Sequence, residues 1–458
     1  MRRRNLLTVG EKVNVEGYLA FEVLTPTSFK FTGKNSNTVQ YSINGNAWQP
    51  LADATYTNTL NQGDKIYFKG TCTPISSAGI GTFASTGGTW NVKGTPMSLL
   101  YGDNFDGQTS LEGKDYVFLN LFYQCTSLKS AENLSLPATT LAPNCYNSMF
   151  RGCYNLTTAP SLPATTLATS CYTYMFQGCY SLKTPPSLPA TRLAPNCYVY
   201  MFQGCTSLTT APSLPATTLA SSCYSYMFQA CSSLKTPPSL PATTLAPSCY
   251  KEMFYACTSL TTAPSLPATT LATDCYSGIV RNTNLLPDCT NIDFSSPTVV
   301  ASGGLRSLFY GTKLTDVQLD AILKSHGINN YSLPCTTLAT GCYYGMFYAC
   351  PSLTTAPSLP ATTLATSCYN SMFHGCTSLT TAPSLPATVL TLQCYQYMFY
   401  QCANLSSITC LATNISAGSC TIGWVNGVAS TGTFTTPSST NWTTGVSGIP
   451  TGWTRIDA

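Results

Sequence analysis

The chain has 458 residues, of which 44% are hydrophobic and only 8% are charged, with a formal net charge of +4. An average soluble protein has about a quarter of its residues charged, so solubility here rests on uncharged polar side chains, as suits a protein at an outer surface or in a crowded assembly. The small, dispersed charge argues against nucleic-acid binding, and the high hydrophobic fraction argues against a charged disordered chain.

The N-terminal segment shows no export signal. The basic run Arg2–Arg4 is followed by residues 5–11, NLLTVGE, in which polar residues interrupt any apolar core of a signal peptide. No window reaches the roughly eighteen apolar residues of a membrane-spanning helix. If Met1 is the native start, we expect a protein that folds in a cytosol, leaves by another route than general secretion, and does not insert into a membrane.

Residues 1–100 are predicted to form a β-rich domain resembling a small β-sandwich. Asn44-Gly45 is a hairpin signal and Gly63-Asp64 a turn signal. Short alternating patterns indicate strands at 13–15, 29–31, 41–43 and 65–68. Residues 98–135 then hold a first degenerate repeat, marked by Leu121-Phe122 and Cys125.

A repeat of 26 residues follows, and the 23 cysteines reveal it. Cysteine pairs 8 residues apart recur after a further 18 residues, at 145/153, 171/179, 197/205, 223/231, 249/257, 342/350, 368/376 and 394/402. Leu-Pro pairs keep the same register, beginning at 136, 162, 188, 214, 240, 266, 333, 359 and 385. A period of 20–50 residues is typical of a solenoid, in which each unit stacks on its neighbours.

Within one unit, 162–187, the apolar residues suggest a short helix followed by short strands. Cys171, Met175, Cys179 and Leu182 are spaced 4, 4 and 3 residues apart, which is a helical stripe. Ser170 suits the N-cap position of that helix, and the Thr-rich remainder has prolines that mark corners. We therefore predict an α+β solenoid over 101–430, whose coils pair a short helix with short parallel strands about 4.8 Å apart.

The cysteines are predicted to be free, buried thiols. Two cysteines eight residues apart on one helix lie about 12 Å apart along its axis, too far for a disulfide. Cys is also among the residues most often buried. The chain has no Cys-x-x-Cys and only two histidines, His326 and His374. We therefore expect no metal site, and no cofactor.

The array is predicted to be interrupted at 286–330. Ile279-Val280 replaces Met-Phe before the interruption, and Leu308-Phe309 marks a weaker coil within it. The sequence Thr315-Asp-Val-Gln318 reads as a capping box that opens a helix ending at Gly327, most simply a packing element. Further on, Trp424-Val425 stands for Met-Phe. Residues 431–458 are expected to form an irregular β C-terminal cap, because terminal coils need a cover.

The repeated run resembles the BspA-like leucine-rich repeat family. Phe150-x-x-Cys153-x-x-Leu156 followed by Leu162-Pro163 carries the match, which extends over about 117–430. The unit is a few residues longer than is usual in that family. The resemblance implies an adhesive surface protein of bacteria or of the phages that infect them, and it implies no catalytic residues.

No catalytic motif was found. Gly-x-Ser-x-Gly, the P-loop and His-Glu-x-x-His are absent, and the carboxylates are scattered. His374 occupies a repeat position that holds other residue types elsewhere, which favours a surface side chain over a catalytic base. The chain is therefore interpreted as a binding protein and not an enzyme.

Candidate ligand-binding residues are those that vary between otherwise constant repeats. Two stripes of such residues are predicted on the outer surface: Tyr174, Tyr200, Tyr226, Tyr344 and Tyr397 in the first, and Gln177, Gln203, Gln229, Tyr255, Tyr348, His374 and Tyr400 in the second. Tyr combines a rigid apolar ring with a hydrogen-bonding tip, which suits interfaces and sugars. Neutral variation at exposed positions remains the alternative.

The leading functional hypothesis is a bacteriophage virion surface component, such as a fibre, decoration or host-attachment protein. Its expected partners are other virion proteins, or a glycan or protein on the host-cell surface, and it could form a homo-oligomer. A bacterial cell-surface adhesin and an intracellular protein-interaction scaffold are the two alternatives.

Overall fold

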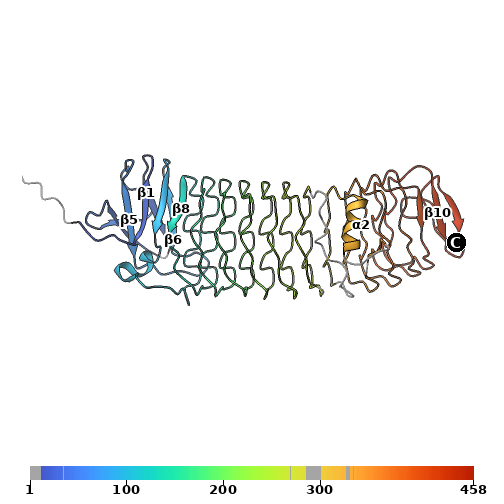
Figure 1. Cartoon of the computed structure of the whole chain (residues 1–458), viewed down its shortest axis with the longest axis horizontal. Coiled ribbons are helices and arrows are strands. Elements are labelled where there is room, and N and C mark those ends of the chain that lie inside the picture. Colours follow the sequence, from blue (N-terminus) through green and yellow to red (C-terminus); the bar gives the residue numbers. More distant parts are fainter. Residues whose placement is uncertain (1–11, 35, 269, 285–300, 326–330, 334) are drawn as a thin grey trace, which may run out of the picture. The chain divides into compact units, whose positions relative to one another are not determined.

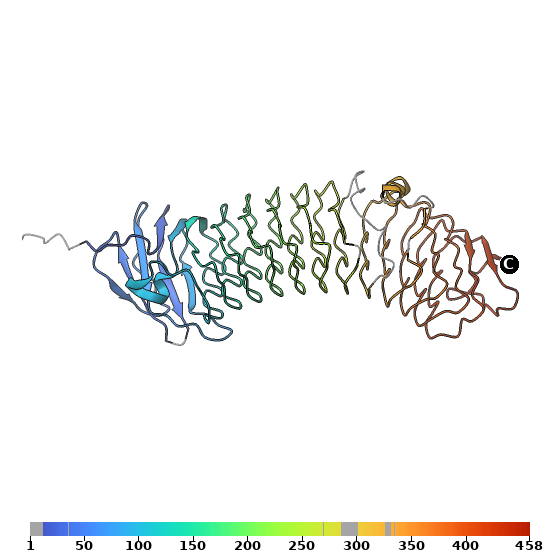
Figure 2. The same ribbon diagram turned by 60° about the horizontal axis from the view of Figure 1, so that its bottom comes forward.

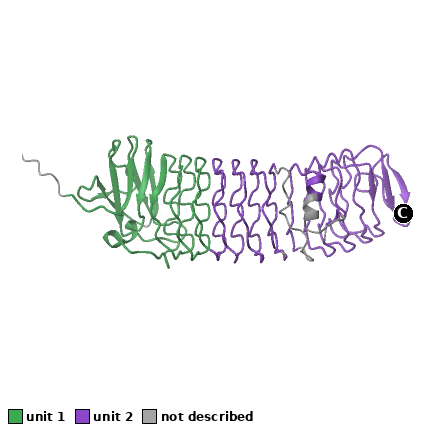
Figure 3. Cartoon of the chain, in the orientation of Figure 1, with its two compact units in different colours: residues 1–190 green, residues 191–458 purple. Residues whose placement is uncertain are grey.

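The structure is a computed structural model that describes residues 12–34, 36–268, 270–284, 301–325, 331–333 and 335–458 (Figure 1; Figure 2). It divides into two compact units, Met1–Ala190 and Thr191–Ala458 (Figure 3). The predicted helix end at Gly327 and the first part of the predicted interruption, 286–300, lie outside the described residues.

The N-terminal part of the first unit is β-rich, as predicted. Six strands form a sheet in the order β4-β3-β5-β1-β7-β8, with bounds β1 Leu19–Val23, β3 Val39–Ile43, β4 Gln49–Leu51, β5 Lys65–Gly70, β7 Trp90–Gly94 and β8 Leu128–Leu134. A second sheet pairs β2 (Phe29–Gly33) with β6 (Gly81–Ser85). Phe21 on β1 lies 5.0 Å, between ring centroids, from both Phe29 and Phe83. The two sheets therefore enclose an aromatic core.

The first coil continues the N-terminal sheet. β8 pairs in parallel with β7, with Trp90 opposite Leu128, while the other pairs in this sheet are antiparallel. Ser130 of β8 in turn forms a parallel bridge with Thr158 of the next coil. A short helix, α1 (Ser98–Tyr101), and a 3₁₀ turn, η1 (Gly102–Asn104), lie between β7 and β8 in the chain.

The predicted helix in each repeat is wrong, because this segment is a series of β-turns. In the coil around 142–153, the N–H groups of Cys145, Met149 and Cys153 each bond to the carbonyl three residues earlier, at 3.1–3.2 Å. Every fourth residue has a positive φ: Asn144 (56°), Ser148 (56°) and Gly152 (75°). A positive φ at the third residue alone is typical of type II turns. The predicted N-cap residues, such as Asn144, are these left-handed turn residues.

The remaining N–H groups join one coil to the next. Tyr146, Ser148 and Phe150 donate to the carbonyls of Cys171, Thr173 and Met175, at 2.9–3.0 Å. Backbone donors along the turn segment thus alternate between a partner within the coil and a partner on the next coil. This alternation satisfies the buried backbone without a helix. Side chains consequently fall in pairs, two inward and then two outward, with a period of four residues.

The predicted parallel pairing is present, but the strands within the regular coils shrink to single bridges. In the second unit Arg192 pairs with Thr218, and Thr210 with Thr236. The prolines explain the short pairing, since each removes a backbone donor from the ladder. The residues that form these bridges are therefore isolated, most of them threonines, between proline-containing corners.

Stacked side chains fill the core of both units. Ring centroids of Phe122 and Phe150 lie 5.3 Å apart in the first unit, and those of Phe228 and Phe254 lie 5.7 Å apart in the second. The second cysteine of a repeat donates its thiol to the carbonyl of the phenylalanine one coil back, as Cys257 does to Phe228 at 3.0 Å. Every cysteine among the described residues is buried and free, which confirms the thiol prediction for that part of the chain.

Two further elements belong to the second unit. α2 (Asp316–Ser325) opens with the predicted capping box, in which the Gln318 side chain accepts from the Thr315 N–H at 2.9 Å and the Thr315 hydroxyl accepts from the Gln318 N–H at 3.4 Å. Near the C-terminus, β9 (Ser407–Thr409), β10 (Thr433–Thr436) and β11 (Thr454–Asp457) form a parallel sheet in the order β11-β10-β9. The Trp424 ring stacks on Trp442 at 5.5 Å beside this sheet.

Candidate ligand-binding face

The outward-facing residues of the coils are the two central residues of each type II turn. In the repeat around 142–153, these are Asn147 and Ser148 in one turn and Arg151 and Gly152 in the next; Asn147 and Arg151 are partly exposed, whereas Ser148 and Gly152 are buried. Their neighbours Tyr146 and Phe150 are almost fully buried. The turn, rather than a helix face, therefore determines which side chains are displayed.

The predicted first stripe occupies strained backbone. Tyr174, Tyr200, Tyr226 and Tyr397 all have φ between 53° and 59°, a left-handed conformation that a bulky residue seldom adopts. Tyr344 lies one position earlier in its turn, and Gly345 takes the left-handed position in that coil. Tyr344 instead lies beneath the guanidinium of Arg306, 4.3 Å from the ring centroid.

Within the second unit, Tyr200 and Tyr226 lie together. Their ring centroids are 4.5 Å apart and their planes differ by 9°. On the neighbouring position of the same coils, the Gln203 side-chain amide donates to that of Gln229. Tyr174 and Gln177 belong to the first unit, where the Arg151 guanidinium lies 5.2 Å from the Tyr174 ring centroid.

The second stripe forms a continuous stack of planar groups in the second unit, which we call the outer aromatic stack: Tyr255, Arg281, Tyr310, Tyr348, His374 and Tyr400. The Arg281 guanidinium lies 5.2 Å from the ring centroid of Tyr255 and 4.1 Å from that of Tyr310. Next come Tyr310 to Tyr348 at 4.3 Å, Tyr348 to His374 at 4.1 Å, and His374 to Tyr400 at 4.7 Å, with planes within 19° of parallel. All six side chains are partly exposed.

Sequence reasoning missed Arg281 and Tyr310 because both lie in degenerate coils. The signal was nevertheless present, since each directly follows the residue at the repeat phenylalanine position, Val280 or Phe309. Tyr397 borders the stack, with its ring edge-on to Tyr400 at 5.8 Å. It also lies across Gly423, where an added Cβ would be 2.7 Å from Cε1 of Tyr397.

The outer aromatic stack is close to electrically neutral. Burial lowers the pKa of His374, so its imidazole is uncharged at neutral pH. Burial also raises the pKa of Tyr348, which keeps the phenol protonated. The one fixed cation, Arg281, lies 3.9 Å from the carboxylate of Glu252. Because the ring faces are stacked on one another, this surface presents ring edges and hydroxyl groups, and its near-neutral charge favours uncharged ligands over polyanions.

Coils of 26 residues that share hydrogen bonds and ring stacks with the next coil define a repeat solenoid with a display surface. The family described as BspA type leucine rich repeat region (6 copies) matches residues 115–234, 188–286 and 305–422, and the chain belongs to this family. Its repeats are generally non-catalytic binding repeats and typically surface-associated. No curated protein and no solved structure matches the chain.

No helix among the described residues has the length and apolarity needed to cross a membrane. The same residues contain no group of three side chains suited to hold a metal ion.

Proposed function

We propose that the chain is a ligand-binding solenoid displayed on a bacteriophage virion, as a fibre, decoration or host-attachment component, and that the outer aromatic stack is its main binding surface. The observation that carries the binding role is the uninterrupted series of partly exposed planar groups from Tyr255 to Tyr400. Aromatic rings supply large contact area with little conformational freedom to lose on binding.

The strained tyrosines of the first stripe support the same role. A non-glycine residue in the left-handed region costs about 1–2 kcal/mol. Other coils of the second unit place Gly278 or Gly423 at this position, so the fold accepts a residue without strain there. A ring at Tyr200, Tyr226 or Tyr397 thus adds surface at the expense of stability, as is common at functional sites.

The ligand that this surface suits is a neutral glycan or an extended peptide on the host-cell surface. Successive groups of the stack lie 4.1–5.2 Å apart, so sugar rings or side chains of a linear ligand can contact several of them at once. Near-neutral charge removes the attraction that a nucleic acid would need.

Binding is tested by replacing Tyr310, Tyr348 and Tyr400 together with Ser and measuring adsorption of labelled protein to host cells. Removing the rings should weaken binding at least about tenfold, roughly 1.4 kcal/mol, while circular dichroism stays unchanged. The matched control replaces Tyr154 and Tyr180, an exposed stacked pair in the first unit, 40% and 48% exposed. Full binding by the triple variant would refute the role of the stack.

A second triple variant tests the predicted stripe Tyr174, Tyr200 and Tyr226. Replacement by Ser should retain the fold and also weaken adsorption, if these rings extend the binding surface. Binding equal to that of the unaltered protein would restrict the site to the outer aromatic stack.

The proposed location is supported by the surface association of the family and by the polar, weakly charged composition, which a bacterial cell-surface adhesin would share. Immunogold labelling of a lysate separates the possibilities. Label on phage particles supports the virion proposal. Label on the cell envelope would favour the adhesin, and label confined to the cell interior would favour an interaction scaffold.

A further inference from the structure

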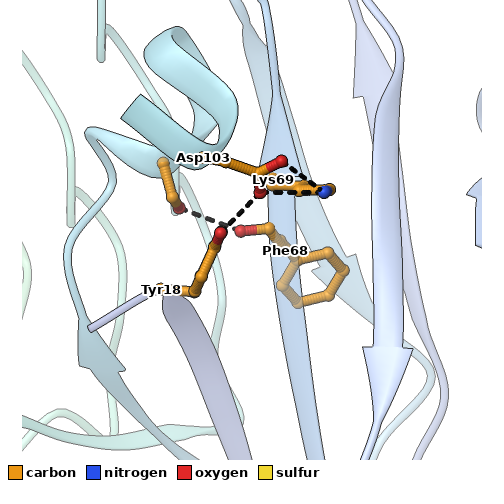
Figure 4. A network of polar contacts seen from close by, with 5 residues as sticks. Tyr18, Phe68, Lys69 and Asp103 are labelled. Carbon is orange, nitrogen blue, oxygen red and sulfur yellow. Dashed lines mark hydrogen bonds and ion pairs between the residues drawn. The ribbon is translucent and has the colours of Figure 1, made fainter. Parts of the chain in front are cut away.

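A second cluster of binding chemistry lies in the N-terminal domain, away from the repeats. Gln40 on β3 and Lys69 on β5 are register partners, and Tyr18 directly precedes β1, which pairs with the other edge of β5. Asp103 of η1 lies against this row. The Tyr18 hydroxyl donates to Asp103 Oδ1 at 2.5 Å, and Lys69 Nζ donates to its two oxygens at 2.8 and 3.0 Å (Figure 4).

The segment that carries Asp103 is anchored to the sheet. The Ser98 hydroxyl of α1 donates to the carbonyl of Phe68 on β5 at 2.9 Å, which ties the α1–η1 segment to the sheet. Gly102 then turns the chain with a φ of 56°, a conformation that favours glycine. Asp103 is thereby held within hydrogen-bond distance of Lys69.

The charges of Asp103 and Lys69 cancel, yet the carboxylate of Asp103 remains exposed and can accept further hydrogen bonds. Hydrogen bonds from Lys69 and Tyr18 lower the pKa of Asp103, and burial together with Asp103 raises the pKa of Tyr18 to about 12. At neutral pH the cluster thus holds a carboxylate, an ammonium and a neutral phenol. The Asp103 side chain is 64% exposed, whereas Lys69 is 15% exposed, so the oriented carboxylate remains available to a ligand.

Aromatic rings surround the same cluster. The Tyr18 ring lies 5.1 Å from that of Trp48 and 4.6 Å from that of Phe105. Lys69 Nζ lies 4.6 Å from the centroid of the Trp48 ring. Trp48 and Phe105 are both only partly buried, so apolar ring surface and fixed polar groups occur side by side.

A cavity of about 370 Å³ opens at this cluster. Lys69, Asp103, Gln40, Tyr101 and Asn104 line it together with two threonines and two glycines. The volume lies at the lower end of the roughly 300–1,000 Å³ range of small-molecule sites. Its wall combines an amide from Gln40, an amide from Asn104, a carboxylate and a phenol ring, which are groups that bind hydroxyls or stack on a sugar face.

We propose that this pocket binds a neutral pyranose residue of a glycan, independently of the repeats. The carboxylate of Asp103 accepts hydrogen bonds from sugar hydroxyls, and Gln40 and Asn104 each offer both a donor and an acceptor. An anionic sugar is disfavoured because Asp103 already neutralises Lys69, and a cation is disfavoured by Lys69 itself. An apolar ligand would leave the polar wall unpaired.

The test is saturation-transfer NMR on the full chain with methyl α-glucoside, methyl α-galactoside, methyl α-mannoside and the methyl glycoside of N-acetylneuraminic acid as probes. At least one neutral glycoside should show saturation transfer and titrate with millimolar affinity. The acidic glycoside should bind at least about tenfold more weakly. Absence of transfer to all three neutral probes, or preference for the acidic one, would overturn the proposal.

Two variants locate the site. Asp103→Asn removes the charge of an exposed side chain, and Gln40→Ala shortens another exposed residue; each should weaken glycoside binding at least about tenfold while circular dichroism shows the fold retained. Asp106→Asn, the same change at an exposed carboxylate outside this pocket, should bind normally. Equal binding by Asp103→Asn and Asp106→Asn would overturn the assignment. The triple variant of Tyr310, Tyr348 and Tyr400 should retain glycoside binding, which separates this site from the proposed function.

Discussion

The turn structure of the repeat predicts opposite effects for two substitutions on adjacent coils. Ala349 and Gly375 occupy equivalent positions, with φ of 53° and 72°, and their N–H groups bond to the carbonyls of His374 and Tyr400 at 2.7 and 2.8 Å. The left-handed conformation costs alanine about 1–2 kcal/mol. Glycine offsets about 0.4–1 kcal/mol of this cost, because it increases the conformational entropy of the unfolded chain. Ala349→Gly should therefore stabilise its coil by about 0.5–1 kcal/mol.

Gly375→Ala should destabilise by a similar amount. A Cβ at Gly375 would lie 3.7 Å from the Cα of Ala349, an ordinary contact, so the expected cost arises from the backbone conformation alone. In a helix both signs would reverse, because glycine is about 0.8–1 kcal/mol less favourable than alanine there. The two substitutions thus distinguish a turn from a helix by sign.

Local stability is the quantity to measure, because a long repeat array need not unfold in one step. Hydrogen exchange followed by mass spectrometry reports the opening of each coil. Exchange in peptides covering residues 346–350 should slow about two- to fivefold in Ala349→Gly, and that in peptides covering 372–376 should quicken about as much in Gly375→Ala. Faster exchange in Ala349→Gly together with slower exchange in Gly375→Ala would refute the turn geometry.

Three further predictions concern the core. Phe228 is fully buried and stacked on Phe202 and Phe254 at 5.6 and 5.7 Å. Phe228→Ala should therefore lower the free energy of unfolding by about 3–5 kcal/mol. A urea unfolding profile equal to that of the unaltered protein would contradict this. The buried hydroxyl of Tyr369 has no hydrogen-bond partner among the described residues. Tyr369→Phe should therefore leave the urea midpoint unchanged or raise it. A clear loss of stability would show that the hydroxyl does form a hydrogen bond. Burial raises the pKa of Cys257 to about 12, above the roughly 8.5 of an unfolded thiol. The stability that the buried, protonated thiol contributes is complete below about pH 8.5 and is lost as pH rises towards 12. Melting temperatures should therefore fall, and iodoacetamide labelling should begin, only as the protein unfolds at alkaline pH. Rapid labelling at pH 8 would show that the thiols are accessible.

The repeat register and its buried positions were predictable because they depend on periodicity alone. Cysteine and Leu-Pro spacing located the coils, and degenerate pairs such as Leu308-Phe309 and Trp424-Val425 were correctly aligned, since Phe309 stacks on Phe347 and Trp424 receives the hydrogen bond from Phe399. The capping box at Thr315 was also predictable, because its two hydrogen bonds are local.

The helix was wrongly predicted because a turn repeat of four residues resembles a helical turn of 3.6. Spacings of 4, 4 and 3 between Cys171 and Leu182 fit both structures. A stricter test was available, since four residues of a helix rotate a side chain by about 40° beyond a full turn, whereas the pattern of two inward and two outward residues shows no drift. Pro143-Asn144 was a second signal, because Pro followed by Asn suits the central positions of a type II turn.

The N-terminal pocket could not be predicted from sequence. Gln40, Lys69 and Asp103 come from three separate segments, and only the strand register and the α1–η1 segment bring them together. No motif marks them, and each alone reads as an ordinary surface residue. The stripes of displayed residues, by contrast, required only the repeat register, and their role in binding stays a prediction.

In this fold the residues that stabilise the coils are distinct from the residues that face outward. Backbone donors of the turn segment find partners within the coil or on the next one, and inward side chains such as Phe228 complete the core. Outward side chains therefore contribute little that the fold requires, as Gly278 and Gly345 show at the left-handed position. A ring at Tyr226 is strained in that position and stacked on Tyr200, which gains contact area but lowers stability. Variation among coils is consequently concentrated at the outward positions, where side chains can change without altering the core.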